Sequence, residues 1–363
     1  MSKLLFDYDP LLYAAGFKGE TRSVKVVHQQ SGDEYEFSTR TDFWGHHKKR
    51  AGGWLAEYNA AKAEDNRRHP DEFIVTDVQV PGPIEECLHT LKMMIRGHKE
   101  VAGAKTYYGY TGKGTVFRED VSTVLKYKGN REGVLRPVHL DAMKDYLIKN
   151  HGCKVVTGIE ADDACTMDLY DAYKVWLKTK SDDDKVILAF SDKDYWQCAG
   201  HLYHTDSGKF HSQGDIFGKL FIVEGSKGKK DVKGYGRLWL YFQVMNGDDA
   251  DNYCANSANP AMKWAQMSAY NVLKDATNDK EAFEALISGY KTLYPSPKKI
   301  IGWRGYEDPK DRTILKPDAQ DFEIEVDWLY MLQENFTLAK MLRWHGDKVL
   351  VTDVMNKLGV KYE

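Results

Sequence analysis

The chain has 363 residues, enough for two domains or for one large α/β domain with insertions. Hydrophobic residues make up 42% of it, so a sizeable core can form and disorder is excluded as the main state. Its 51 basic and 54 acidic residues give a net charge of −3, which excludes a general polycation. Contact with a polyanion would therefore need a local basic patch.

Nothing in the sequence predicts a membrane-spanning or secreted protein. Apolar runs such as residues 186–190 are far too short to cross a bilayer. The first seven residues already include an acid, Asp7, so we expect no signal peptide. The five cysteines form no Cys-x-x-Cys pair, a pattern typical of reduced thiols. We therefore expect a cytoplasmic protein.

The first part of the chain predicts a strand, a helix and an insertion. Residues 3–6 form an apolar strand that ends in Asp7-Tyr8-Asp9, and helical sequence follows. Residues 22–39 alternate between apolar and polar around a turn, which predicts a hairpin. Residues 42–75 are polar and basic, with a His46-His47-Lys48-Lys49-Arg50 run. We expect about residues 18–80 to be an insertion into the core fold.

From residue 83 onward the pattern alternates between helix and strand. We expect helices at about 83–96, 140–150 and 161–178, and strands at 105–110, 154–156 and 186–190. Cys165, Leu169, Ala172 and Trp176 are spaced by four, three and four residues, so one helix face should be buried. This alternation predicts an α/β fold with a doubly wound, mostly parallel sheet.

Two regions depart from this alternation. Residues 111–137 are rich in glycine and lysine and predict a mobile, partly helical segment. The chain beyond Asn252 has a mainly helical pattern with no comparable strand run. We place a domain boundary near residue 240, which gives a core at 1–240 and a mainly helical region at 241–363.

Acidic residues gather in clusters at the predicted strand ends and at one helix start. The clusters are Asp7 with Asp9, Glu160-Ala161-Asp162-Asp163, Asp192-Lys193-Asp194 and Asp248-Asp249-Ala250-Asp251. In an open parallel sheet, the carboxyl ends of the strands converge on the crevice where ligands bind. Carboxylates at a helix start are favoured by the helix dipole. We therefore expect these groups to share one site.

Carboxylates brought together in this way must protonate or hold cations. Two of them about 5 Å apart, at an effective dielectric near 20, repel by roughly 3 kcal/mol. Oxygen ligands without soft donors select Mg²⁺ or Mn²⁺, and several carboxylates leave room for two ions. Two ions can activate a water and stabilise the leaving oxygen of a phosphodiester. A single Asp-x-Asp is more often a turn or helix cap, so the metal site is predicted by the combination of clusters.

The order of these motifs resembles a known family. Residues 160–163, 191–194 and 247–252 are similar to the three acidic motifs of the 5′→3′ exonuclease and flap endonuclease family, in its bacteriophage branch. Asp7 is similar to the family's first acid. Residues 127–131 resemble the part of the family's helical arch that meets the scissile phosphate. The resemblance covers about residues 3–17 and 84–255.

The resemblance implies a nuclease core related to the PIN domain, an arch at about residues 111–137 and hydrolysis by two ions, Mg²⁺ or Mn²⁺. It implies that the metal ligands, direct or through water, are Asp7, Glu160, Asp162, Asp163, Asp192, Asp194, Asp248 and Asp251. Glu160, Asp162 and Asp7 would favour the first ion, Asp248 and Asp251 the second. Lys128 and Arg131 would hold the phosphate, and Tyr127 would stack on a base.

The implied partner is DNA, as 5′ ends, single-stranded flaps and duplex, with RNA–DNA hybrids in primer removal. The implied protein is a monomer that meets replication proteins in the host bacterial cytoplasm and binds DNA through its C-terminal region. A basic and aromatic stretch fits single-stranded nucleic acid, although a solvated loop is the alternative. Its candidate substrate-binding residues are Lys113, Arg118, Lys126 and Tyr127.

The sequence departs from the family's pattern in two places. The family has an acid after the strand that precedes the arch, whereas here Thr111-Gly112 follows. Another acid, Asp9 or Glu119, could fill that position. The family's glycine-rich hairpin after the last acidic motif is replaced by residues 253–260. The grip on duplex DNA is therefore expected to be weaker or built differently.

Two other functions compete with the nuclease. A haloacid-dehalogenase-like phosphatase would use Asp7 and Asp9, but Leu11 occupies a position where that chemistry needs a small polar residue. A non-catalytic DNA-binding module is conceivable because Thr111 replaces an acid, although the other acids argue against it. Zinc binding by Cys198, His201, His204 and His211 is disfavoured because their spacing matches no closed zinc pattern.

Overall fold

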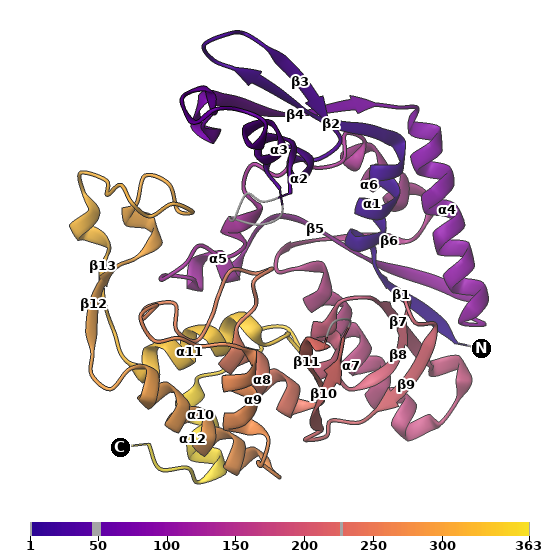
Figure 1. The fold of residues 1–363 in the computed structure, drawn as a ribbon. Coiled ribbons are helices and arrows are strands. Elements are labelled where there is room, and N and C mark those ends of the chain that lie inside the picture. The colour runs from indigo at the N-terminus through magenta and orange to yellow at the C-terminus, as the bar shows by residue number, and fades with distance from the viewer. Residues whose placement is uncertain (1, 46–51, 226–227, 363) are drawn as a thin grey trace. The chain divides into compact units, whose positions relative to one another are not determined.

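A central sheet organises the first of two compact units. The computed structural model describes residues 2–45, 52–225 and 228–362. The sheet has the strand order β6-β5-β1-β7-β8-β9 (Figure 1). Its strands are β1 (Lys3–Asp7), β5 (Thr106–Val116), β6 (Cys153–Gly158), β7 (Val186–Phe190), β8 (Gly200–His204) and β9 (Lys209–Gln213). All neighbours are parallel except β8 and β9, which confirms the expected mostly parallel sheet.

Burial on both faces explains the composition of the middle strands. All five residues of β7 are buried, and Leu4 and Leu5 of β1 are fully inaccessible. Helix α7 (Ala161–Thr179) packs against β1, β5, β7 and β8. Cys165 and Leu169 enter the same apolar cluster as strand residues, as their helical spacing predicted. A continuous apolar run is the expected sequence of a strand covered on both sides.

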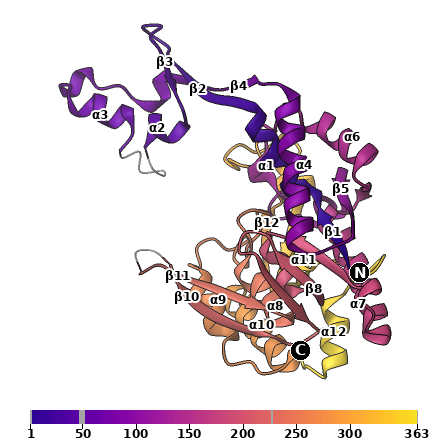
Figure 2. The same cartoon turned by 90° about the vertical axis from the view of Figure 1, so that its right-hand side faces the viewer.

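The second unit comprises residues 10–95 and 133–147. It contains an antiparallel sheet of β2 (Glu20–His28), β3 (Glu34–Phe37) and β4 (Phe73–Pro81), with α2 (Arg40–Trp44) and α3 (Trp54–Ala60) beside it (Figure 2). An aromatic cluster forms its core. The predicted hairpin is confirmed by β2 and β3. The basic run at 46–50 lies outside the described residues.

Three helices each contain residues of both units. They are α1 (Tyr8–Gly16), α4 (Ile84–Val101) and α6 (Leu140–Asn150). The helix predicted at 83–96 is thus confirmed and continues for another turn. The helix predicted at 140–150 has the expected bounds.

The C-terminal part of the first unit is mainly helical, as expected. Its helices are α8 (Arg237–Asn246), α9 (Gln266–Leu273), α10 (Asp279–Leu293), α11 (Trp328–Ala339) and α12 (Val351–Leu358). Two antiparallel ribbons join them: β10 (Lys219–Glu224) with β11 (Lys230–Tyr235), and β12 (Lys298–Ile301) with β13 (Glu323–Val326). The second ribbon differs from the expectation of no strands here. Its strands have only four residues each, too short to give a clear alternating pattern.

Residues on both sides of position 240 belong to this first unit. The segment expected to form an arch contains the end of β5, the short helix α5 (Phe117–Val121) and the 3₁₀ turn η4 (Gly129–Arg131). Within the described residues, no helix combines the length and the apolar composition needed to cross a membrane.

Candidate metal centre and phosphate-binding loop

Acidic side chains follow the carboxyl ends of neighbouring parallel strands. Asp7 is the last residue of β1, and Asp192 comes two residues after β7. Glu160 follows β6 and caps the start of α7. Asp192 lies close enough to Asp7 that its charge adds to the effects of burial and of Asp9 in raising the pKa of Asp7. The topology of the sheet thus brings together acids that are far apart in the sequence.

One group of carboxylates lies at the start of α7. Single oxygens of Glu160, Asp162 and Asp163 all lie within 4.8 Å of one another. Burial, followed by the charges of Glu160 and Asp163, raises the pKa of Asp162 well above its usual range. Burial also opposes ionisation of Glu160, but Lys128 and Arg118 outweigh it and lower the pKa of this carboxyl. The group therefore holds negative charge that neighbouring cations balance.

Arg118 is a buried structural cation, which corrects the prediction that it binds substrate. Its guanidinium is 3% exposed and donates to both oxygens of Asp163, at 2.5 and 2.9 Å. It also donates to the backbone oxygens of Leu338 and Lys340, at 3.1 and 2.9 Å. A guanidinium held by these acceptors has no route to a solvent-borne phosphate.

The same contacts bear on the prediction that Asp163 is a metal ligand. Its side chain is completely buried, and one of its oxygens also accepts a hydrogen bond from the backbone N–H of Leu342 at 2.9 Å. Both oxygens are thus occupied by the protein. Asp163 joins α5, α7 and the chain after α11. Glu160 also has partners on both oxygens, from Lys128, Arg118 and Tyr127, whereas Asp162 accepts a hydrogen bond at one oxygen from the Asp163 N–H.

The second group of carboxylates comes from two separate turns. Single oxygens of Asp194, Asp248 and Asp251 lie within 4.8 Å of one another. Asp194 stands in η6 (Lys193–Gln197), and the other two follow α8. Burial, then repulsion by Asp192, raises the pKa of Asp194 to about 7. Asp194 is thus grouped with Asp248 and Asp251, the acids that the resemblance assigns to the second ion.

Two residues that contact the second group were not predicted from the sequence. Lys193 forms ion pairs with Asp248 and, at 3.5 Å, with Asp194. The side-chain amide of Gln243 donates to Asp194. Lys193 sits between two predicted ligands, but sequence alone gave no sign that its side chain turns toward them. Gln243 lies in the apolar helix α8 and carried no signal.

Asp7 has hydrogen-bond partners of its own. Its oxygens accept hydrogen bonds from the backbone N–H of Asp9 at 3.1 Å and from the hydroxyl of Tyr195 at 3.2 Å. Burial is the main cause that raises the pKa of Asp7 to about 8, and repulsion by Asp9 adds to it. A buried carboxyl with this pKa gains stability from a cation beside it.

Asp9 is the acid that lies beside Thr111. Its carboxylate accepts a hydrogen bond from the Thr111 hydroxyl at 2.5 Å and another from the Gly112 N–H at 3.3 Å. Glu119, the alternative, lies in α5, where its backbone oxygen accepts hydrogen bonds from Ser122 and Arg304. The geometry thus favours Asp9.

The loop of residues 122–131, the candidate phosphate-binding loop, reaches the acidic groups with two cations. The ammonium of Lys128 pairs with Glu160 and lies 3.5 Å from Asp251. The guanidinium of Arg131 lies 3.3 Å from Asp251 and is about half exposed. Glu160 is the main cause that raises the pKa of Lys128 against the opposing effect of burial. The predicted phosphate ligands therefore stand beside the predicted metal ligands.

Tyr127 differs from its prediction. Its side chain is buried rather than free to stack on a base, and its hydroxyl donates to Glu160 at 2.7 Å. The same hydroxyl lies 3.1 Å from Asp251. A tyrosine between these two carboxylates ties the two acidic groups together.

The remaining substrate-binding candidates lie away from the carboxylates. Lys113 is exposed at the end of β5. Lys126 pairs with Glu132 and sits 5.2 Å from the centre of the Trp303 ring. Neither has an ion pair to the acidic groups, so both remain candidates only for contacts further along a bound strand.

The histidines that suggested zinc are held by aromatic rings. His201 packs edge-on against Trp176, with ring centres 4.3 Å apart. His204 and His211 both contact Trp196. Among the described residues, the possible metal-binding groups are the two carboxylate groups above.

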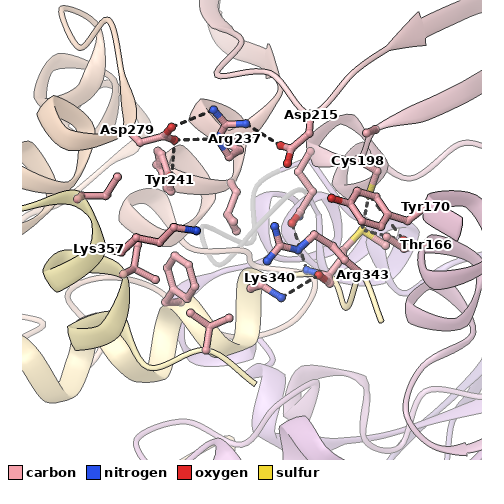
Figure 3. Close-up of a pocket in the computed structure, with 18 residues that line it drawn as sticks. Thr166, Tyr170, Cys198, Asp215, Arg237, Tyr241, Asp279, Lys340, Arg343 and Lys357 are labelled. Atoms are coloured by element: carbon pink, nitrogen blue, oxygen red, sulfur yellow. Dashed lines mark hydrogen bonds and ion pairs between the residues drawn. The ribbon is translucent and has the colours of Figure 1, made fainter. Parts of the chain in front are cut away.

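A cavity of about 340 Å³ lies elsewhere in the first unit, between η6, α8 and the chain from α11 to α12. Figure 3 shows that Arg237 points between Asp279 and Asp215 there, and it donates to both. Lys340 and Arg343, also in its wall, pair with Asp347. These cations are neutralised internally, so the cavity is not an evident anion site.

Fold and site together define an α/β protein with a carboxylate-rich centre at the carboxyl edge of a mostly parallel sheet. No protein-family model matches the chain, and no curated protein matches its sequence. A bacteriophage T5 protein co-crystallised with metal ions is similar in structure, with 13% identity and a TM-score of 0.44, over 99% of this chain and 97% of that one.

Two further solved structures each cover 75% of this chain. One is a mutant of the T5 5′-exonuclease, with 16% identity, a TM-score of 0.38 and 89% of its own chain covered. The other is the bacteriophage T5 flap endonuclease in a pseudo-enzyme–product complex with DNA and metal ions, with 16% identity, a TM-score of 0.40 and 88% covered. We base the function of this chain on its own side chains.

Proposed function

We propose that the chain is a metal-dependent 5′→3′ exonuclease and flap endonuclease that hydrolyses DNA phosphodiesters with two ions. The observation that carries this proposal is the placement of Lys128 and Arg131 beside two groups of closely spaced carboxylates. Carboxylates alone suit a cation site, and cations alone suit a polyanion site. Both side by side suit a reaction at a phosphate.

The donor set fits hard divalent ions. Every candidate ligand is a carboxylate. Burial and repulsion from neighbouring carboxylates raise the pKa values of Asp7 and Asp194, and a cation would relieve both effects. Glu160 and Asp162, with Asp7, would hold one Mg²⁺ or Mn²⁺, and Asp194, Asp248 and Asp251 another. Such ions would supply Lewis acidity toward the phosphate and lower the pKa of an attacking water.

The protein's own residues would orient the substrate. Arg131 is half exposed and presents a planar guanidinium that suits two phosphate oxygens. Lys128 is less exposed and would place a point charge at the reacting phosphate. Exposed Lys113 would contact the bound DNA strand beyond the reacting phosphate. The wider roles that we propose are removal of RNA primers in phage DNA replication and recombination, as a monomer, alongside replication proteins in the host cytoplasm.

The two alternatives make different demands. A phosphatase would need Asp9 free to act beside Asp7, yet the Asp9 carboxylate is engaged by Thr111 and Gly112. A non-catalytic DNA-binding module would gain nothing from buried acids that repel both one another and DNA.

The deciding experiment is cleavage of a 5′-labelled DNA flap with Mg²⁺, beside a small phosphomonoester as a competing substrate. We expect strand cleavage that stops in excess EDTA and no release of phosphate from the monoester. Robust strand cleavage in EDTA would contradict the metal mechanism. DNA binding without cleavage, in Mg²⁺ or Mn²⁺, would favour the binding module.

A further inference from the structure

We propose that the C-terminal region positions the phosphate-binding loop for catalysis, with Glu334, Trp303 and Arg304 as positioning residues that act through Lys128. This inference rests on the proposed nuclease function. It gives a role to Trp303 and Arg304, which the sequence left uninterpreted, and to a region otherwise expected only to bind DNA.

Glu334 of α11 anchors the start of the loop. It is 6% exposed, and its carboxylate accepts hydrogen bonds from the Thr123 N–H at 3.2 Å and the Val124 N–H at 3.3 Å. The Thr123 hydroxyl donates to its other oxygen at 2.5 Å. A buried acid that satisfies two consecutive backbone N–H groups fixes the direction in which the chain leaves α5.

The turn η8 (Trp303–Gly305) holds the same stretch from another side. The Trp303 indole N–H donates to the Ser122 carbonyl at 2.8 Å, and the Trp303 backbone N–H donates to the Thr123 carbonyl at 3.0 Å. Arg304 donates to the carbonyls of Ser122 and Glu119, at 3.2 and 2.9 Å. These contacts join Glu119, Ser122 and Thr123, at the base of the loop, to residues about 180 positions later in the chain.

Close backbone packing at Gly302 supports the same reading. A Cβ atom added there would lie 2.7 Å from the Thr123 carbonyl oxygen. Glycine thus allows the chain before η8 to approach the loop more closely than any other residue would. The contact is built into the backbone and does not depend on side chains alone.

The far end of the loop is joined to the second carboxylate group. The Lys128 N–H donates to the Asp251 carbonyl at 3.0 Å, and the Asn252 amide donates to the Lys126 carbonyl at 2.8 Å. Lys128 has a left-handed backbone, with φ of +54°, which costs on the order of 1 kcal/mol for a non-glycine residue. Anchors at both ends hold this conformation, so the ammonium is already near the acidic groups before a substrate arrives.

Pre-organisation of this kind acts mainly on the chemical step. A misplaced catalytic group, even by about 1 Å, can cost about 100-fold in rate. Loosening the base of the loop should therefore slow cleavage of bound DNA more than it weakens DNA binding.

The test is a double-mutant cycle on single-turnover cleavage, at saturating DNA and Mg²⁺. We expect Glu334→Ala to slow the step by about 10- to 100-fold with little change in the dissociation constant for DNA. Glu334→Gln should restore most of the rate, because its carbonyl can still accept from both backbone N–H groups. Glu323→Gln is the matched control, since Glu323 only pairs with exposed Lys299 on the β12–β13 ribbon.

The second arm asks whether Glu334 acts through Lys128. In a Lys128→Ala background, adding Glu334→Ala should slow cleavage by less than about threefold, because the group being positioned is gone. Multiplicative losses in the double variant would overturn the proposal and leave Glu334 as an ordinary stabilising residue. An unchanged rate in Glu334→Ala would also overturn it.

Hydrogen exchange separates failure of this inference from failure of the nuclease assignment. Glu334→Ala should speed exchange of the Thr123, Val124 and Lys128 amides while leaving β7 protected, whether or not the protein cleaves DNA. Unchanged exchange at those amides would overturn the positioning role even in an active nuclease. If the wild-type protein does not cleave DNA but Glu334→Ala still speeds exchange at these amides, the proposed function would be wrong and the anchoring role would stand.

Discussion

The Thr111 hydroxyl and the Asp9 carboxylate lie 2.5 Å apart, in a hydrogen bond that joins the middle of β5 to the start of α1. Thr111 is fully buried, and the neighbouring N–H of Gly112 donates to the other Asp9 oxygen at 3.3 Å. An acid that follows β1 in the sequence thus lies beside Thr111 of β5. Asp9 also repels Asp7, which raises the pKa of Asp7 beyond the effect of burial.

Magnesium titrations of cleavage test whether Asp9 supports the first ion. We expect Asp9→Asn to raise the Mg²⁺ concentration for half-maximal activity by about 10- to 100-fold. Loss of a residue that supports the ligands of a metal ion typically weakens metal affinity by this factor. Thr111→Asp should not lower that concentration, because a second carboxylate beside Asp9 adds repulsion. Asp182→Asn, on an exposed turn, is the control. A lower Mg²⁺ requirement in Thr111→Asp, with Asp9→Asn unchanged, would show that the site was one acid short.

Asp192→Asn tests the strand-end acids. Asp192 is exposed and accepts a hydrogen bond from the Asp194 N–H at 2.9 Å, a cap that asparagine can also make. We therefore expect a folded protein whose cleavage rate falls by more than about 100-fold. DNA binding should persist or tighten, since a charge that repels phosphates is gone. Asp171→Asn, at an exposed position of α7, is the matched control. Wild-type turnover of Asp192→Asn in limiting Mg²⁺ would remove Asp192 from the site.

Arg118→Ala tests the buried ion pair with Asp163. Removing the guanidinium leaves a carboxylate in a fully buried position without its counter-charge, which typically costs about 3–5 kcal/mol. Chemical denaturation should show this loss, and adding Asp163→Asn should recover part of it. The exposed ion pair of Arg96 with Glu100 is the contrast, and Arg96→Ala should change the free energy of unfolding by too little to measure. A similarly small effect of Arg118→Ala would contradict the structural role.

His201 predicts how stability depends on pH. Burial is the main cause that lowers its pKa to about 4, and Lys185 and Lys180 add to the shift. Because the folded state disfavours the protonated ring, its contribution is present above the unfolded pKa of about 6.5 and is lost as pH falls through 4. The loss should reach roughly 3 kcal/mol at most. His201→Phe should flatten the change in denaturation midpoint between pH 7 and 4, and equal slopes in both proteins would refute this.

The strand-end rule accounts for what the sequence could predict. Apolar runs such as β7 and the helical spacing in α7 identified the core because burial leaves a periodic record in the residues themselves. The positions of Asp7, Glu160 and Asp192 followed from topology, because parallel strands end on one edge. None of this required knowledge of a side chain's rotamer.

Pairing between side chains could not be predicted in the same way. Arg118 and Lys128 are both cations in one basic stretch, and only the folded chain shows that the first is buried against Asp163 and the second faces Glu160. Tyr127 was predicted to stack on a base because the sequence alone does not show whether a single tyrosine is exposed or buried. Glu334 carried no signal, since its partners lie more than 200 residues earlier.

The central position of β1 has a consequence for the protein's synthesis. Its first residue, Lys3, lies opposite Thr106 on one side and Val186 on the other. The strand β1 can therefore pair with β5 only after residues 106–116 have left the ribosome, and with β7 only after residues 186–190 have done so. Closure of such distant pairs is slow, and exposed apolar strands are prone to associate in the meantime. The centre that begins at Asp7 is complete only after Asp251 has emerged, so truncated chains should be inactive and dependent on chaperones.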